Sequence, residues 1–545
     1  MNLNVIIGGK AGQGIDKTAS IIGKTLVKTG YKVFIYRDYG SLIRGDHNYD
    51  VIAISDEEVA SHRKEVQGIV DMDGSTSEKH GERLEDDGFT IERNRFKELE
   101  KDYNKSKNMI YTGSLAKKMD IDLEKLKETI KEEFKGKKRK IIEENLEAAE
   151  KGYGKTENGE IHLKKIEKEE QNDLELITGS EGSAEGAIKA GLDLYLAYPM
   201  TPATPILHIL SQKQKEENLM AFQAENELSV VNAALGASHT GAKTMIGSSG
   251  GGYDLMQESM SMQGVSEIPL TVYLAQRKGE GSGVPTYTEQ GDLEIAVKGS
   301  HGNIPRIVIA PGDPEEAMKA SEQALYFSEN YRCLSVILTD KHLAESKYTV
   351  NEKPEIKELE RNIDTEEKGE LYNHYEVTRN GNSPRTVPGI NTVKSTSYEH
   401  DEKGITTENK EKVKEMVEKR LRKEERIKER SKEFTRYKVH GEKDSENIVI
   451  SCGSTKGAIK DALKDLENTK FVQLIYLRPF PKEIKKELDE AKNVILVENN
   501  SKASLGNLIV EKTGRVIEKD NQILKYDGRP FRSDELRKKI KERLK

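Results

Sequence analysis

The chain is short of cysteine, has no long apolar segment and carries no excess of either charge. Its 545 residues include two cysteines, Cys333 and Cys452, far apart in the sequence. Two such cysteines can neither ligate an iron–sulfur cluster alone nor form a disulfide framework, so we expect a reducing cytoplasm. No apolar run approaches the ~20 residues that cross a bilayer. The opening MNLNVIIGG lacks the features of a signal peptide and reads as a first strand.

The charge balance argues against nucleic acid as a partner. Lysine and arginine number 88 against 95 aspartates and glutamates, and charged residues equal hydrophobic ones at 34%. Nucleic-acid binding requires a clustered basic face, which a near-balanced chain does not indicate. We therefore expect a soluble protein that binds neither nucleic acid nor membrane. Its length is too great for one core and predicts three or four domains.

Alternating strand and helix patterns predict that these domains are of the α/β class. The chain opens with an apolar strand, the glycine-rich turn GGKAGQG, an amphipathic helix and a second strand, an order typical of a parallel layer. In a later charged region, TENKEKVKEMVEKRLRKEERIKERSKEF predicts a solvated bridging helix. We expect a first α/β domain at 1–155, a linker at 156–173, a second α/β domain at 174–346, a turn-rich and charged connection at 347–445, and a third α/β domain at 446–545.

A strand-to-helix turn in the second domain is unusually rich in proline. In LYLAYPMTPATPILHIL, an apolar strand meets an apolar-periodic helix, and three prolines and two threonines lie between them. One interpretation is structural: Thr201 or Thr204 caps the helix and the following proline takes its first position. The other is functional, because ligands bind at the carboxyl ends of strands in open α/β sheets. A threonine hydroxyl and helix N-terminal amides would suit a carboxylate or phosphate.

Three further features lie at predicted strand ends or helix starts. Glu227 opens the helix AENELSVVNAALGASH, whose apolar spacing includes Leu228. The glycine run 250–252 separates a strand from a helix and would let the backbone approach a cofactor closely. Arg277 follows the strand PLTVYLA, and its planar fork suits a carboxylate. Structural interpretations stay open, since acids suit a helix's first turn and arginines form surface ion pairs.

These stretches together resemble one family. YPMTPAT resembles the YPITPxT signature of the α-subunit of 2-oxoacid:ferredoxin oxidoreductases, and AQRKGEGSGVPTYTEQGDL resembles that family's QRxGPSTGxPTxxxQxDL. The stretch from AENELSVV to SSGGG is similar to its glutamate helix and glycine loop. GGKAGQG and YGSLIRGDHNYDV are similar to its γ-subunit, here fused ahead of the α-part. LRPFP and LVENN look like its transketolase-C-terminal-like domain, so the matches cover nearly the whole chain.

The resemblance implies a multi-domain α/β fold with a γ-like domain, a thiamine-diphosphate-binding domain of the pyrimidine type and a transketolase-C-terminal-like domain. It also implies a reaction: a 2-oxo acid (pyruvate or 2-oxoglutarate) is oxidatively decarboxylated on thiamine diphosphate. The acyl group passes to coenzyme A, and electrons leave through iron–sulfur centres to ferredoxin. The resemblance does not indicate which 2-oxo acid is the substrate, because Gly251 and Glu280 stand where family members often have proline.

The resemblance implies roles for individual residues. Glu227 is the carboxyl group beside the pyrimidine ring, which favours the tautomer that takes the C2 proton. Thr201 and Arg277 are the expected contacts of the substrate carboxylate. The expected cofactor-binding residues are Pro199, Glu227, Gly250, Gly251 and Gly252.

The chain also lacks two motifs that this chemistry needs. Thiamine enzymes usually bind the diphosphate through magnesium with a GDG sequence, and no GDG or CxxC occurs here. We therefore expect no metal residue on this chain, and Mg²⁺ and [4Fe-4S] sites on a β subunit without which the chain is inactive. Two alternatives are an indolepyruvate-type thiamine oxidoreductase subunit and a non-catalytic coenzyme-binding protein built on GGKAGQG. That turn, however, lacks both the nucleotide-fingerprint spacing and the P-loop lysine–hydroxyl pair.

Overall fold

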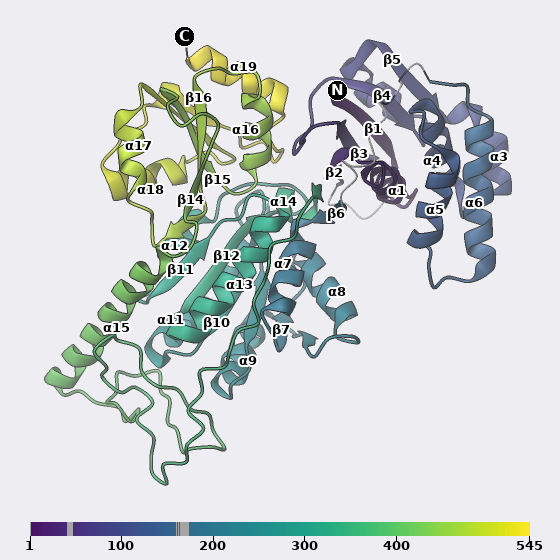
Figure 1. The fold of residues 1–545 in the computed structure, drawn as a ribbon. Coiled ribbons are helices and arrows are strands. Elements are labelled where there is room, and N and C mark those ends of the chain that lie inside the picture. The colour runs from purple at the N-terminus through teal and green to yellow at the C-terminus, as the bar shows by residue number, and fades with distance from the viewer. Residues whose placement is uncertain (1, 41–46, 160, 162, 164–173, 545) are drawn as a thin grey trace.

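Three β-sheets organise the chain in the computed structural model (Figure 1). The structure describes residues 2–40, 47–159, 161, 163 and 174–544. Residues 41–46 of the γ-like motif and most of the expected linker 156–173 therefore lie outside the described residues. Each sheet carries its own helices, so the predicted multi-domain α/β fold is confirmed.

The first sheet has the strand order β5-β4-β1-β3-β2-β13-β6. Its strands are β1 (Asn2–Lys10), β2 (Lys32–Asp38), β3 (His47–Ser55), β4 (Val66–Asp71), β5 (Leu84–Glu92), β6 (Glu175–Thr178) and β13 (Lys347–Val350). Its helices are α1 (Ile15–Val27), α2 (Thr76–His80), α3 (Lys97–Asp102), α4 (Lys107–Lys118), α5 (Leu123–Glu133) and α6 (Arg139–Gly154). The structure differs here from the sequence expectation, which put β6 in the second domain and β13 in the connection. In the structure β13 pairs with β2 and covers its otherwise unpaired edge, and β6 pairs with the far side of β13.

The second sheet has the order β17-β11-β12-β10-β9-β7-β8 and is parallel apart from β17. Its strands are β7 (Leu194–Ala197), β8 (Met220–Gln223), β9 (Thr244–Ser248), β10 (Leu270–Gln276), β11 (Arg306–Ile309), β12 (Leu334–Asp340) and β17 (Tyr476–Arg478). Its helices are α7 (Gly179–Lys189), α8 (Thr204–Lys213), α9 (Glu227–His239), α10 (Gly250–Leu255), α11 (Gln257–Ser266), α12 (Leu293–Lys298), α13 (Pro314–Tyr331) and α14 (Lys341–Glu345). Every residue of β10 and β12 is buried, as in a sheet covered on both faces. The carboxyl ends of these strands consequently meet at one edge.

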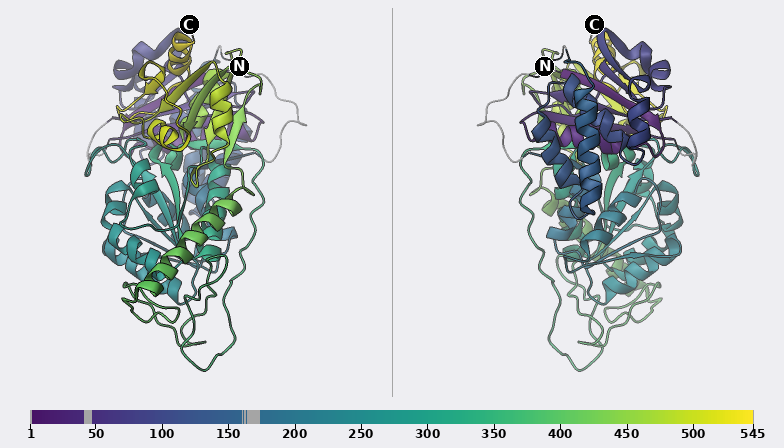
Figure 2. Two further views of the ribbon diagram at one scale, coloured as in Figure 1. Left: turned by 90° about the vertical axis from the view of Figure 1, so that its left-hand side faces the viewer. Right: turned by 90° about the vertical axis from the view of Figure 1, so that its right-hand side faces the viewer.

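The third sheet has the order β14-β16-β15-β18-β19. Its strands are β14 (Tyr437–His440), β15 (Asn447–Cys452), β16 (Thr469–Leu474), β18 (Asn493–Glu498) and β19 (Gln522–Leu524), and its helices are α16 (Thr455–Leu463), α17 (Ile484–Glu490), α18 (Ser504–Thr513) and α19 (Ser533–Arg543). The first and third layers lie at the same end of the molecule, next to the second (Figures 1 and 2). Between them, the Asp461 carboxylate accepts hydrogen bonds from the Ala60 amide at 2.9 Å and the Ser61 hydroxyl at 2.7 Å. The two layers are therefore joined directly.

Helix α15 (Lys410–Ser431) is not solvated on all sides, so this part of the sequence prediction was wrong. Lys419 and Lys423 are buried and both pair with the buried Glu267, Lys419 Nζ at 2.6 Å from Oε1. Burial of a lysine is tolerable only with such a partner. Glu267 lies at the end of α11, so this charge cluster fastens α15 to the second domain. Among the described residues, no helix combines the length and apolar character that a membrane crossing requires.

Removing the shared partner should destabilise the chain. Glu267→Gln leaves two buried ammonium groups uncompensated, a loss that typically costs about 3–5 kcal/mol. Burial lowers the pKa of Lys419 to about 8. The deficit should therefore shrink between pH 7 and 9, as the lysines shed their protons. Denaturant unfolding of the purified chain at both pH values measures this. Glu425→Gln, which breaks an exposed pair with Lys428, is the control, and an equal response of the two variants would contradict the assignment.

Candidate active site

The residues predicted from the sequence gather at the carboxyl edge of the second sheet. Successive elements deliver them: the turn after β7, the start of α9 after β8, the start of α10 after β9, and the residue after β10. These residues are, in that order, Pro199 and Thr201, Glu227, Gly250 to Gly252, and Arg277. The parallel strand order β10-β9-β7-β8 makes the four loops neighbours, because parallel strands all end at the same edge.

The proline turn contains a cis peptide bond between Thr201 and Pro202 and leads into α8. The helix begins at Thr204, and its N-cap is Ala203, which makes no side-chain capping bond. The interpretation of this turn as a threonine-capped helix start is therefore wrong. The Ala203 amide instead donates to the Met200 carbonyl at 2.8 Å, so a backbone turn precedes the helix. The hydroxyl of Thr201 is consequently not committed to a helix cap.

Arg277 and the proline turn are in direct contact. Arg277 Nη1 donates to the backbone carbonyl of Thr201 at 2.8 Å, although 76 residues separate the two. Arg277 is half-buried, and burial lowers the pKa of its guanidinium, opposed by the charge of Asp292. Four of the five N–H groups of a guanidinium remain beyond this bond. The turn therefore holds Arg277 in place and leaves other N–H groups of its guanidinium to bind an anion.

Glu227 is a buried carboxyl group, with 5% of its surface exposed. It is the first residue of α9, behind the N-cap Asn226, whose side chain accepts from the Ser229 amide. Glu225 is exposed and accepts a hydrogen bond from the Ser229 hydroxyl at 3.1 Å. Of the two glutamates, Glu227 alone is placed for a desolvated role. Leu228, one of the apolar positions at helical spacing, is 51% exposed.

The glycine run forms a cradle with one open position. A Cβ on Gly252 would lie 2.1 Å from Ser248 Oγ and 2.8 Å from Glu227 Cγ, so neighbouring side chains occupy that space. A Cβ on Gly250 would lie 2.4 Å from the Asp292 carboxylate. A Cβ on Gly251 would meet nothing closer than 3.9 Å. The backbone at Gly251, next to the Gly252 that packs against the buried Glu227, is thus open to a bound group.

Asp292 is a site residue that the sequence analysis missed. Its amide donates to Gln276 Oε1 at 2.9 Å, and its carboxylate lies against Gly250. Burial and repulsion by Glu289 raise the pKa of this carboxyl group to about 6, whereas the Arg277 charge lowers it. It belongs to the QGDL motif, the one signal that pointed to it. Asp292 provides the counter-charge of Arg277.

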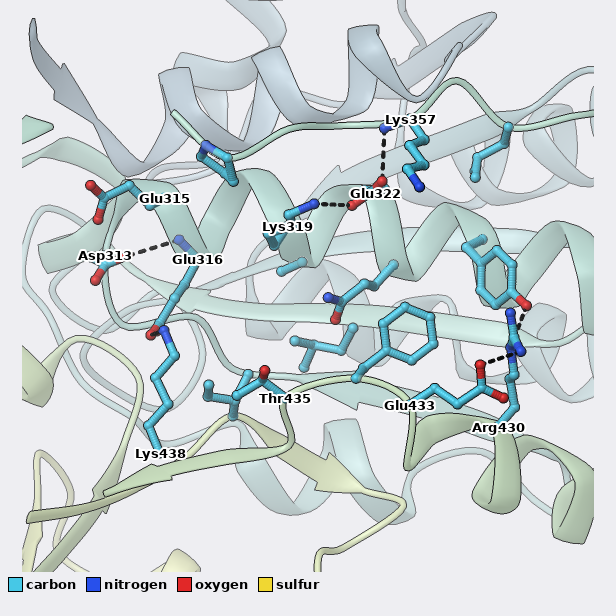
Figure 3. Close-up of a pocket in the computed structure, with 18 of the residues that line it drawn as sticks. Asp313, Glu315, Glu316, Lys319, Glu322, Lys357, Arg430, Glu433, Thr435 and Lys438 are labelled. Atoms are coloured by element: carbon cyan, nitrogen blue, oxygen red, sulfur yellow. Dashed lines mark hydrogen bonds and ion pairs between the residues drawn. The ribbon is translucent and has the colours of Figure 1, made fainter. Parts of the chain in front are cut away.

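A separate cavity of about 1110 Å³ lies between α13, the segment after β13 and the end of α15 (Figure 3). Its charged side chains largely pair with one another. Lys319 Nζ lies 3.0 Å from Glu322, and Glu316 Oε1 accepts from Lys438 at 2.8 Å and from Lys456 at 2.7 Å. None of the predicted site residues lines it. We interpret this cavity as a gap at the interface between domains.

The packing of the glycine run predicts that alanine substitutions at two adjacent glycines change the free energy of unfolding in opposite directions. Gly252→Ala should lower the free energy of unfolding by about 1–3 kcal/mol, because its methyl group overlaps Ser248 and Glu227. Gly251→Ala faces open space in the same helical turn and should gain up to about 0.5–1 kcal/mol. Denaturant unfolding of the purified chain measures both. Equal shifts in the two variants would show that the cradle is not as tight as described.

Comparison with known proteins places the chain. Residues 185–419 match a family described as "Pyruvate flavodoxin/ferredoxin oxidoreductase, thiamine diP-bdg", and residues 4–100 and 94–155 match "Pyruvate ferredoxin/flavodoxin oxidoreductase". A 2-oxoacid:ferredoxin oxidoreductase subunit alpha from Sulfolobus sp is 29% identical over 98% of this chain and 96% of its own length. The 2-oxoglutarate synthase subunit KorA of Methanocaldococcus jannaschii is 28% identical over 67% of this chain and 99% of its own.

A solved structure agrees over the full length. The 2-oxoglutarate:ferredoxin oxidoreductase from Magnetococcus marinus, with 2-oxoglutarate, coenzyme A and succinyl-CoA bound, superposes with a TM-score of 0.89 at 25% identity and covers all of both chains. The family matches follow the order expected from the sequence, with the γ-like part ahead of the α-part. The chain therefore belongs to the 2-oxoacid:ferredoxin oxidoreductase family, as an alpha subunit of the fused γ–α type.

Proposed function

We propose that this chain supplies half of the active site of an oxidoreductase that converts a 2-oxo acid, pyruvate or 2-oxoglutarate, and coenzyme A to acyl-CoA and CO2, with ferredoxin as electron acceptor. One observation carries the proposal. The buried side chain of Glu227 packs against Gly252, next to the open backbone of Gly251, at the sheet edge where Arg277 meets the proline turn. The relatives named above carry out chemistry of this class.

The cradle fits thiamine diphosphate. Glu227, Pro199 and the glycines 250–252 would hold its pyrimidine end, and the cofactor, when bound, supplies the carbon nucleophile that attacks a 2-oxo group. The role of this chain is to share a proton with the cofactor ring. A carboxyl group shielded from water shares a proton with a ring nitrogen more readily than a solvated one. Glu227, nearly free of solvent at the first position of α9, meets that requirement.

Arg277 and Thr201 would hold the substrate carboxylate. The Thr201 carbonyl fixes one side of the guanidinium, which leaves further N–H groups for the anion. The hydroxyl of Thr201 would provide the second contact. The carboxylate departs as carbon dioxide, so it should not be stabilised too strongly. Asp292 moderates the positive charge of Arg277 and so serves that need.

We assign the Mg²⁺, diphosphate and [4Fe-4S] sites to a β subunit. The site is bordered by exposed large apolar side chains, which on a folded surface mark a place that another molecule covers. They come from the turn after β7, the edge strand β8, the start of α9 and the end of α10, and are Tyr198, Met220, Phe222, Leu228 and Leu255. A partner seated there would close the site. The two cysteines, both buried with free thiols, are in keeping with the cytoplasm as compartment.

Glu227→Gln in the complex reconstituted with the β subunit tests this function. The amide cannot act as an acid or base as the carboxyl group does, so release of the thiamine C2 proton should slow by about 10²- to 10⁴-fold, the usual size of a general acid–base contribution. NMR-detected hydrogen–deuterium exchange of bound cofactor measures it. Glu225→Gln, on the exposed side of the same turn, should have a mild effect. If Glu225→Gln were equally slow, the assignment to Glu227 would fail.

Substitutions at Arg277 and Thr201 test the carboxylate grip. Arg277→Ala should lower kcat/KM by a factor equivalent to about 2–5 kcal/mol, because a charged hydrogen-bonding partner is removed. Thr201→Val keeps the carbonyl that braces Arg277 and removes one hydroxyl contact, so it should lose at most about 1.5–3 kcal/mol. Arg277→Lys should recover part of the loss. Steady-state dye reduction with several 2-oxo acids measures these effects, and a change within a few-fold for Arg277→Ala would rule out the grip.

A further inference from the structure

The loop that carries Arg277 is closed at its base. We call residues 277–290 the arginine loop; it begins at Arg277, directly after β10, and ends at Gln290, ahead of α12. The amide of Lys278, the residue next to Arg277, donates to the Tyr287 carbonyl at 2.9 Å. The Lys278 ammonium also pairs with Glu289 at 3.1 Å. The position of Tyr287 therefore fixes the backbone beside Arg277.

Two other domains hold Tyr287. Its hydroxyl donates to Asp38 Oδ1 at 3.3 Å, at the end of β2 in the first domain. The guanidinium of Arg529, in the third domain, lies over its ring with Cζ 3.6 Å from the centroid. Arg529 and Asp38 are themselves paired, Nε to Oδ2 at 2.9 Å. The adjacent Thr288 amide donates to the Gly528 carbonyl at 3.1 Å. Three domains thus converge on one side chain of the arginine loop.

Asp38 is the centre of this junction. It is 4% exposed, and its Oδ2 also accepts from the hydroxyls of Tyr36 at 2.8 Å and Tyr49 at 3.3 Å. A buried carboxylate with this many donors is held in one orientation, because turning it would break several hydrogen bonds at once. Asp38 is therefore a rigid reference point rather than a passive surface residue.

We propose that Asp38 is a positioning residue for Arg277: through Tyr287 and Arg529, this carboxylate of the γ-like domain fixes the base of the arginine loop. The inference rests on the function proposed above for Arg277. It gives the γ-like domain a part in substrate binding beyond that of a scaffold. A displacement of about 1 Å in a group that orients substrate can cost about a hundredfold in rate, even when the substitution is remote from the chemistry.

Asp461 offers a matched control. It too is a buried aspartate that joins the first and third domains, through Ala60 and Ser61. Its hydrogen bonds involve no residue of the arginine loop. Asp38→Asn and Asp461→Asn therefore both weaken the junction of the first and third domains, but only the first should release the loop.

The experiment uses the complete complex with the β subunit. Hydrogen exchange measured by mass spectrometry should show faster exchange of peptides covering 278–290 in Asp38→Asn and no change there in Asp461→Asn. With a series of 2-oxo acids, Asp38→Asn should raise the KM for the acid and lower kcat/KM about 10- to 100-fold. Tyr287→Phe, a milder variant that loses only the hydroxyl contact, should act in the same direction and less strongly.

A double-mutant cycle separates positioning from general damage. If Asp38 acts through Arg277, Asp38→Asn should have no further effect on kcat/KM in an Arg277→Ala background. An equal loss in that background, or equal effects of Asp38→Asn and Asp461→Asn, would overturn the proposal. If Arg277→Ala left kcat/KM unchanged, the failure would lie in the proposed function, because Arg277 would not bind the substrate carboxylate. Unchanged exchange at 278–290 in both Asp38→Asn and Tyr287→Phe would overturn the positioning role by itself.

Discussion

The parallel pairing of β10, β9, β7 and β8 is the constraint on which the site depends. Each strand of such a sheet must end at the same edge, so four loops from different parts of the chain become neighbours there. Arg277 and Thr201 meet for this reason. Glu227 and the glycine run 250–252 follow from the same geometry. Reversing any one strand would carry its functional residue to the opposite edge.

Buried charges then fix the arrangement of the domains around that sheet. Asp340, at the end of β12, accepts from the hydroxyls of Thr288 at 3.3 Å and Ser454 at 2.6 Å, which ties the arginine loop and the third domain to the same strand end. Glu267 does the same for α15. Such groups add little net stability over an apolar contact, but an unpaired one is costly. They therefore select one relative placement of the domains, and the site geometry inherits that placement.

Local sequence patterns predicted those site residues whose positions follow from where a strand ends or a helix starts. Glu227 begins α9 and Arg277 follows β10, both as expected, because apolar periodicity marks where elements start and stop. The patterns could not show which distant groups pair. The first sheet recruits β13 from more than 300 residues away, and α15 buries Lys419 that a charge pattern reads as solvated. Asp292 and Asp38 escaped notice for the same reason, since their importance lies in partners remote in sequence.

The shared first sheet explains how a γ-like domain can be held closely enough to influence the second domain. β6 and β13, which flank the second domain, hydrogen-bond into the first sheet, and the Thr349 hydroxyl exchanges hydrogen bonds with the backbone of Val33 at 2.7 and 3.0 Å. A separate subunit would have to offset its lost rotational and translational freedom before it could hold Asp38 in place. Fusion and a continuous sheet remove most of that cost. A contact as long as the 3.3 Å bond from Tyr287 to Asp38 can then set the position of a loop, because the carboxylate is part of the same rigid layer.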